Sequence, residues 1–143
     1  MTINERQDEI VEEFAMLDAW EDKYEYIIDL GKKLLPMPTD QKTDTTKIKG
    51  CQSQVWVHAE SKEGLVHLNG DSDAMIVRGL VAMVLRVLDG QRPADVAQAD
   101  LYFPSQIGMD RHLAATRSNG LAAMIKQVKL YGMALSLQEQ ARQ

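Results

Sequence analysis

The chain has 143 residues, of which 45% are hydrophobic, and its 16 basic and 21 acidic side chains give a net charge of −5. A domain of this length buries about 68–70% of its unfolded surface, so it can form a core without disulfides or a structural metal. The negative charge disfavours the phosphate backbone of a nucleic acid as a partner.

The beginning of the chain lacks the basic and apolar stretches of a secretory signal. The most apolar window, residues 74–88, contains Arg78 and Arg86 and is too short to span a membrane. We therefore expect one domain over residues 1–143, in the cytoplasm and without membrane association.

Two helices are predicted before the first prolines. Thr2 and Glu5 have the spacing of a capping box, and apolar residues follow at helical spacing. Asp18 is the expected cap of a second helix, which ends before Pro36 because proline cannot continue a helix. The polar residues 39–46 then predict an exposed loop that leads to Cys51, the only cysteine of the chain.

A β-hairpin is predicted next. Residues 53–60 alternate between apolar and polar side chains, and residues 65–69 form a second candidate strand. A two-residue loop at 62–63 would place His58 opposite His67.

The remaining segments predict helices. Asp71 and Asp73 are expected to cap an apolar helix over about residues 73–89, although they also allow a paired-carboxylate site. Gly79 is expected to allow close backbone contact within that helix, and Gly90 to follow its C-terminus.

A short helix is expected after Pro93, residues 101–116 read as irregular, and a final helix starts at Ser118. The order of elements indicates an α+β fold, a small antiparallel sheet of two to three strands with helices on one face.

Several chemistries are weakly supported. One cysteine and three histidines (His58, His67 and His112) lack the spacing of a zinc site, and an iron–sulfur cluster needs several thiolates. The sequence contains no nucleophile elbow, dinucleotide-binding motif or Walker loop. A cysteine hydrolase is neither indicated nor excluded, because a distant histidine can fold into place beside the thiol.

Sulfur transfer requires only one cysteine, because a thiolate can accept sulfur as a persulfide and release it to a second acceptor. In an extended segment, Lys47 and Lys49 would share a side with Cys51 and favour its thiolate, unless they are only solvated. Gly50 would ease the approach of a partner, and Val55 and Trp56 would shelter the thiol. A packed, inert cysteine remains the alternative.

Four ordered segments carry a family resemblance. The central one is Gly-Cys-Gln-Ser-Gln-Val-Trp at residues 50–56, and the others span residues 20–31, 70–74 and 117–121. Together they resemble the SufE family, the sulfur acceptors that serve cysteine desulfurases in iron–sulfur cluster assembly. Thr46 and Asn119 differ from the Asn and Gln that relatives often have there.

The resemblance implies a fold related to the IscU-type scaffolds and a role for Cys51 as carrier of a persulfide. The sulfur would come from a SufS-like or CsdA-like cysteine desulfurase and pass to an iron–sulfur scaffold such as SufBCD. Pyridoxal phosphate would belong to the desulfurase, and this chain would hold no cofactor or metal and be no stand-alone enzyme. The residues expected to support the loop or contact a partner are Gly50, Gln52, Ser53, Gln54, Asp73 and Arg117.

Two other interpretations remain. The chain could be a non-catalytic module that regulates a desulfurase, with Cys51 only packed, or a carrier that feeds a different sulfur pathway.

Overall fold

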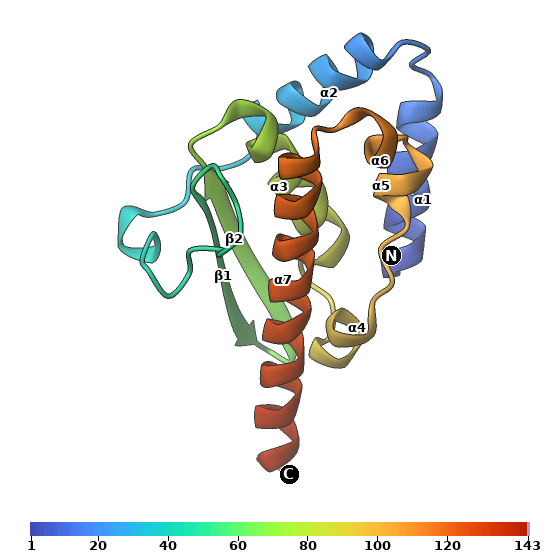
Figure 1. The fold of residues 1–143 in the computed structure, drawn as a ribbon. Coiled ribbons are helices and arrows are strands. Elements are labelled where there is room, and N and C mark those ends of the chain that lie inside the picture. Colours follow the sequence, from blue (N-terminus) through green and yellow to red (C-terminus); the bar gives the residue numbers. More distant parts are fainter. Residues whose placement is uncertain (143) are drawn as a thin grey trace.

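The computed structural model describes residues 1–142, apart from the side chains of residues 115, 116 and 118, and has the predicted α+β architecture (Figure 1). A hairpin packs on a central helix, and further helices surround that helix. The elements in chain order are α1 (Ile3–Ala15), α2 (Trp20–Lys32), the 3-10 turn η1 (Thr39–Gln41), β1 (Val55–Lys62), β2 (Leu65–Ser72), α3 (Met75–Leu88), α4 (Pro93–Gln98), α5 (Phe103–Gln106), α6 (Met109–His112) and α7 (Ala115–Ala141).

The two strands form an antiparallel hairpin whose register differs from the prediction. Glu63 and Gly64 form the turn, and both have positive φ angles, 56° and 79°. Left-handed conformations at both central residues are typical of the tight turns that join twisted strands. His58 therefore pairs with Asn69 instead of His67. The predicted turn was one residue too early because nothing in a glutamate side chain signals a left-handed conformation.

A short segment before Cys51 extends the sheet beyond β1. The Ile48 N–H donates to the Val55 carbonyl at 2.8 Å, and the Val57 N–H donates to the Thr46 carbonyl at 2.9 Å. These bonds make an isolated bridge and not a full third strand. They fix both ends of the intervening loop, residues 49–54.

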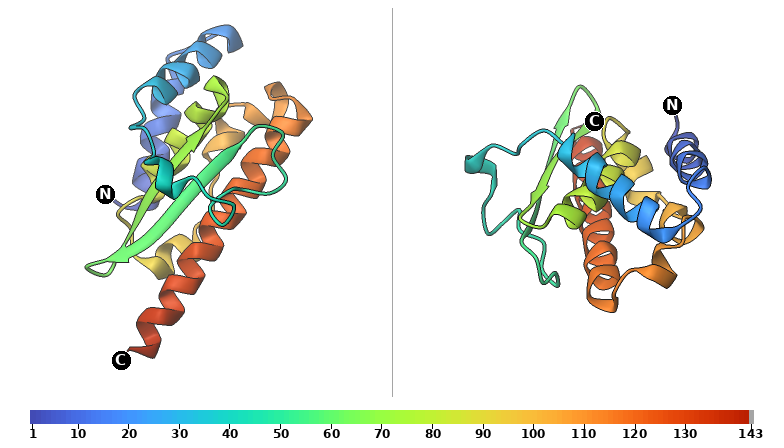
Figure 2. Two further views of the ribbon diagram at one scale, coloured as in Figure 1. Left: turned by 90° about the vertical axis from the view of Figure 1, so that its left-hand side faces the viewer. Right: turned by 90° about the horizontal axis from the view of Figure 1, so that it is seen from above.

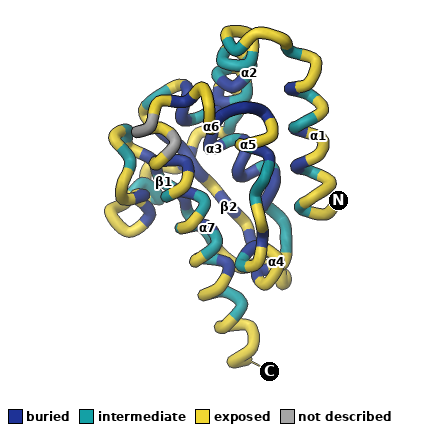
Figure 3. Tube along the Cα trace, turned by 45° about the vertical axis from the view of Figure 1, so that its right-hand side comes forward, coloured by how far each residue is buried: buried dark blue, intermediate teal, exposed yellow. Residues whose placement is uncertain are grey.

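Helix α3 forms the centre of the core, as its apolar sequence predicts, and most of its residues are buried (Figure 3). It crosses α2 at Gly79, where an added Cβ would lie 2.1 Å from the Ile27 carbonyl oxygen. The predicted close contact at Gly79 is therefore confirmed.

Only one of the predicted N-terminal caps is present. Thr2 and Glu5 form the capping box of α1. Ala19 occupies the cap position of α2, so Asp18 does not cap that helix. Ala74 occupies the cap position of α3, and the predicted caps at Asp71 and Asp73 are also wrong. The carboxylates of Asp71 and Asp73 instead contact residues distant in the sequence, Lys42 and Gln54, and these contacts compete with capping of α3.

Asp71 is buried in β2 and joins three segments of the chain. Its Oδ2 lies 3.2 Å from Lys42 Nζ, and its Oδ1 lies 2.9 Å from Arg78 Nε in an ion pair without hydrogen-bond geometry. Burial alone would raise the pKa of Asp71, but hydrogen bonds from Ser72, Lys42 and Met37 and the charge of Arg78 outweigh it and lower the pKa. The carboxylate thus stays charged inside the protein.

Helix α7 begins at Ala115, three residues before the predicted start. It packs against the hairpin and, around Gly132, against Val96 of α4, and its C-terminal turns extend beyond the body of the protein (Figures 1 and 2). The segment predicted as irregular contains the short helices α5 and α6. Gly90 adopts a positive φ of 76° after α3, and Pro93 starts α4, as predicted. None of the helices within residues 1–142 is long and apolar enough to cross a bilayer.

Candidate functional site

Cys51 lies in the loop 49–54, between the bridge and β1. Gly50 has a φ of 89°, a conformation that side-chain-bearing residues rarely adopt. A Cβ added there would meet only Ala123 Cβ, at 3.8 Å, so the backbone conformation and not crowding requires glycine. The extended geometry assumed for residues 47–51 does not hold, because the chain turns at Gly50.

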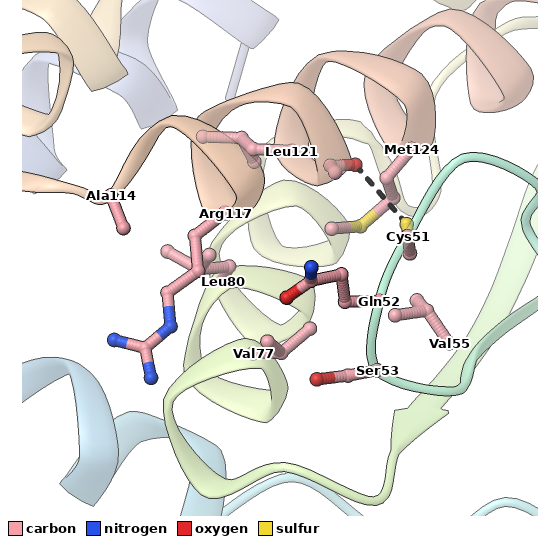
Figure 4. Close-up of a pocket in the computed structure, with 11 residues that line it drawn as sticks. Cys51, Gln52, Ser53, Val55, Val77, Leu80, Ala114, Arg117, Leu121 and Met124 are labelled. Carbon is pink, nitrogen blue, oxygen red and sulfur yellow. Dashed lines mark hydrogen bonds between the residues drawn. The ribbon is translucent and has the colours of Figure 1, made fainter.

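The thiol faces a pocket of about 330 Å³ between the loop, α3 and α7 (Figure 4). Apolar side chains from three elements make up much of its lining. These are Val55 of β1, Val77 and Leu80 of α3, and Leu121 and Met124 of α7. A sulfur atom held at Cys51 therefore has apolar side chains of α3 and α7 on one side of it and polar residues of the pocket on the other.

The first half of α7 covers the thiol directly. Cys51 Sγ lies 3.6 Å from the Gly120 carbonyl oxygen, which accepts its S–H (Figure 4). A Cβ added at Gly120 would lie 3.3 Å from the sulfur, so glycine lets α7 approach this closely. Cys51 is half-buried, and burial raises the pKa of its thiol above the ordinary value. The free protein thus holds Cys51 as a protonated thiol at neutral pH.

The two lysines near Cys51 in sequence do not face this pocket. Lys47 and Lys49 are exposed and line a separate hollow on the other side of the loop. Burial is the cause of the shifted pKa of Cys51, and no cation opposes it. The geometry favours the alternative interpretation, in which these lysines are solvated and do not favour the thiolate.

The expected shelter by Trp56 is also absent from the pocket. Val55 is buried and lines it, but Trp56 lies on the opposite face of β1, where Lys42 Nζ sits 5.2 Å from its ring centroid. Adjacent residues of a strand point to opposite faces, so Val55 and Trp56 cannot both cover the thiol.

The other residues predicted for the site surround the loop. Gln52 and Ser53 line the pocket, and Arg117 lies across it from Cys51, with its Nη1 donating to the Tyr24 hydroxyl at 3.3 Å (Figure 4).

The end of the loop is held by Asp73. Its Oδ1 accepts the Gln54 N–H at 3.0 Å, and its own N–H donates to the Gln54 carbonyl at 3.2 Å. Gly50, Gln52, Ser53, Gln54, Asp73 and Arg117 are thus brought together around one loop. Their functional roles stay predictions.

Sequence reasoning missed the residues of α3 and α7 that form the walls of the pocket. The sequence pattern predicts only that Val77, Leu80 and Met124 are buried in the core. It does not indicate that they lie beside the thiol. Gly120 and Leu121 lie inside the family-like segment 117–121, which was the one signal that could have found them.

None of the three histidines lines the pocket within the described residues. His112 instead stacks on Trp20, with ring centroids 4.7 Å apart. A hydrolytic mechanism therefore lacks a histidine beside the thiol. Across residues 1–142, no group of three or more His, Cys, Asp or Glu side chains is arranged to hold a metal ion.

Comparisons with known proteins show the family of this chain. Residues 8–131 match the family model described as SufE, the Fe-S metabolism associated domain. An uncharacterized SufE-like protein of Rhizobium meliloti is 45% identical over 127 residues, which cover 85% of this chain and 91% of the relative. A similar protein of Rhizobium etli is 40% identical over 127 residues, with coverage of 85% and 86%.

A solved structure shares the fold. The solution structure of a hypothetical protein from Thermus thermophilus has a TM-score of 0.75 and covers 90% of this chain and 94% of its own. At 21% identity, this likeness concerns the fold alone.

Proposed function

Because the chain belongs to the SufE family, we propose that it accepts sulfane sulfur from a cysteine desulfurase as a persulfide on Cys51 and passes it to an iron–sulfur assembly scaffold. It would act in this way as a transfer partner and activator of the desulfurase, and not as a stand-alone enzyme. Pyridoxal phosphate would remain with the desulfurase. This chain's contribution is the thiol and the surface around it.

The transfer is a displacement between sulfur atoms. The Cys51 thiol loses its proton, and its thiolate attacks the outer sulfur of a persulfide on the desulfurase. A sulfur–sulfur bond forms at Cys51 while the bond to the donor cysteine breaks, and the donor cysteine leaves as a thiolate that takes up a proton. The transferred sulfur keeps its oxidation state, so no external oxidant is needed. An acceptor thiolate then repeats the displacement on Cys51.

The position of Cys51 is the observation that carries the proposal. The chain's one thiol sits in a loop at the edge of a pocket with apolar walls from α3 and α7, half-buried beside the Gly120 carbonyl. An apolar wall supports retention of a persulfide because it limits access by other thiols in solution. The raised pKa of Cys51 keeps the thiol neutral and therefore a poor nucleophile until a partner changes its surroundings.

The alternative of a regulatory module with an inert cysteine makes a different prediction. Mass spectrometry after incubation with a cysteine desulfurase and cysteine should find one additional sulfur atom on Cys51, in a form that a reductant removes. An unchanged mass at Cys51, together with full stimulation of the desulfurase, would overturn the carrier proposal in favour of the module.

Cys51→Ser is the matched variant for this experiment. It keeps the shape of the side chain, so circular dichroism and thermal unfolding should resemble those of the natural chain. We expect the variant to lose sulfur delivery to a scaffold completely. Delivery that persists in this variant would show that Cys51 does not carry the sulfur.

A further inference from the structure

A second hollow lies on the other side of the Cys51 loop. It has a volume of about 510 Å³ and is bounded by Lys47, by Lys49 at the start of the loop and by Lys126 of α7. Ala123 and Leu130, also from α7, give it an apolar wall, and Leu130 is 45% exposed. We refer to it as the lysine hollow. The loop thus forms a partition between the lysine hollow and the thiol pocket.

The three lysines of the hollow have no carboxylate partner within residues 1–142. The ion pairs of the described chain involve Lys32, Lys42, Arg78 and Arg86 instead. Asp44 is the one carboxylate that lines the hollow, and it lies beyond ion-pair distance of the lysines. Three cations against one anion leave a local positive charge in a chain whose net charge is −5.

Charge is also unevenly distributed across the molecule. Helix α1 carries five carboxylates and one basic residue, and Arg86 of α3 pairs with two of the carboxylates, Glu9 and Glu13. It lies on the side of the molecule opposite the Cys51 loop, as two perpendicular views show (Figures 1 and 2). The field of an acidic partner repels the carboxylates of α1 and attracts the lysines of the hollow. It therefore orients this protein with the hollow toward the partner during their encounter.

We propose that the lysine hollow docks an acidic segment of the desulfurase, with an apolar side chain of that segment against Ala123 and Leu130. This inference rests on the proposed function. We infer an acidic segment because its carboxylates would complement the three lysines. We infer an apolar side chain in it because the exposed Leu130 would be buried against that side chain. A nucleic acid fits poorly, because three cations in a negatively charged chain give little counterion release.

The location of the hollow connects docking with sulfur transfer. Lys49 is two residues before Cys51, and Ala123 is adjacent to Met124, which lines the thiol pocket. A segment bound in the hollow therefore brings the rest of the desulfurase to the entrance of the pocket. The lysines act in positioning and not in the sulfur displacement, because they do not line the thiol pocket.

The test is the affinity of this chain for its cognate desulfurase, measured by calorimetry at low and high salt. The variant K47E/K49E/K126E reverses the charge of the hollow. The matched control, K32E/K62E/R142E, changes three exposed cations elsewhere by the same amount. We expect the triple reversal to raise the Kd about tenfold at low salt, since exposed charges each contribute modestly. The increase should shrink at high salt, and the control should change the Kd less than twofold.

A second measurement separates docking from damage to the loop. Inorganic polysulfide loads a thiol without docking, so the triple variant should gain sulfur at Cys51 as fast as the natural chain. Lys126→Glu changes a charge on α7 alone and should still raise the Kd about twofold. If the triple variant gains sulfur slowly, its substitutions have damaged the loop, and the Kd of Lys126→Glu becomes the test. A Kd raised about twofold would support the docking site, and an unchanged Kd would contradict it.

The outcomes distinguish this inference from the proposed function. Equal affinities of the triple variant and the control would overturn the docking site, even if Cys51 accepts sulfur normally. A change in oligomeric state without a change in affinity would overturn it too, in favour of a contact between copies of this chain. A lysine-dependent affinity without sulfur on Cys51 would keep the docking site and overturn the carrier.

Discussion

At the α2–α3 crossing, a methyl group on Gly79 would lie 2.1 Å from a carbonyl oxygen, whereas one on Gly50 in the Cys51 loop would lie 3.8 Å from its nearest neighbour. The first glycine is required by packing between two helices. The second is required by its own positive φ and has free space around it. The crossing is thus constrained by contact between two backbones, whereas the close contact of the loop is made by the Cys51 side chain with Gly120. Substitutions in the two regions should affect different properties.

Gly79→Ala should give the largest effect. The new Cβ would collide with the backbone of Ile27, which cannot move aside as a flexible side chain can. We expect a loss of about 4 kcal/mol of unfolding free energy, measured by chemical denaturation. Shortening Ile27 to Ala in the same chain should not restore stability, because the carbonyl remains. Restoration would mean that the side chain, and not the backbone, sets the contact.

Asp71→Asn should have the next largest effect, because Asp71 lies beside the α2–α3 crossing. Arg78 donates to the Leu34 carbonyl after α2 at 2.7 Å and pairs with Asp71. Removing the carboxylate charge leaves two cations without their partner and should cost about 2–3 kcal/mol.

The effect of Asp71→Asn should depend on pH. The pKa of Asp71 is lowered in the folded protein, so its stabilisation is present above the ordinary aspartate pKa and is lost as the pH falls through the folded value. The variant should therefore differ most from the natural chain near neutral pH and approach it in acid. A constant difference across this range would contradict the role of the charge.

Gly50→Ala should have a smaller effect on stability and a distinct effect on the thiol. The left-handed backbone costs a residue with a Cβ about 1–2 kcal/mol, and the loop can relax because little surrounds it. We expect faster alkylation of Cys51 as the loop leaves α7. Gly64→Ala is the matched control, because Gly64 has a φ of 79° and no neighbour within 4 Å. It should cost similar stability without changing alkylation.

The smallest effect on stability concerns the pKa of Cys51. Burial raises this pKa, so at rising pH the unfolded chain loses the thiol proton first. The stability that the neutral thiol contributes should decline slightly above its ordinary pKa, and Cys51→Ser should remove this decline. Alkylation of the folded protein should show the same raised midpoint. A midpoint at or below the ordinary thiol value would mean that cations, and not burial, control Cys51.

The sequence predicts the α2–α3 region better than the Cys51 loop, for a physical reason. The apolar run of α3 and the glycine after it are local signals, and the structure follows them, although the caps predicted for α2 and α3 are wrong. The contact of Cys51 with Gly120 joins residues 69 positions apart, and no local pattern encodes it. Cys51 was identified as the only cysteine of the chain and by the family resemblance, and not by periodicity.

The errors also share a cause. Asp71 and Asp73 looked like helix caps because short polar residues before an apolar run usually are. Lys42 and Arg78 bind the Asp71 carboxylate instead, and the Gln54 N–H donates to Asp73. The two lysines appeared to flank the thiol only because the chain was assumed to continue straight through Gly50.

The bonds that close the loop also set how far the thiol can travel. Ile48 is held to β1 and Gln54 is held by Asp73, and Cys51 is three residues from each. A fully stretched chain spans about 3.3–3.6 Å per residue, so the tether limits Cys51 to about 10 Å from either anchor. Such a reach allows the sulfur to emerge from its pocket but not to cross the surface of the protein. Any donor or acceptor must therefore bring its own reactive atom to this one corner of the molecule.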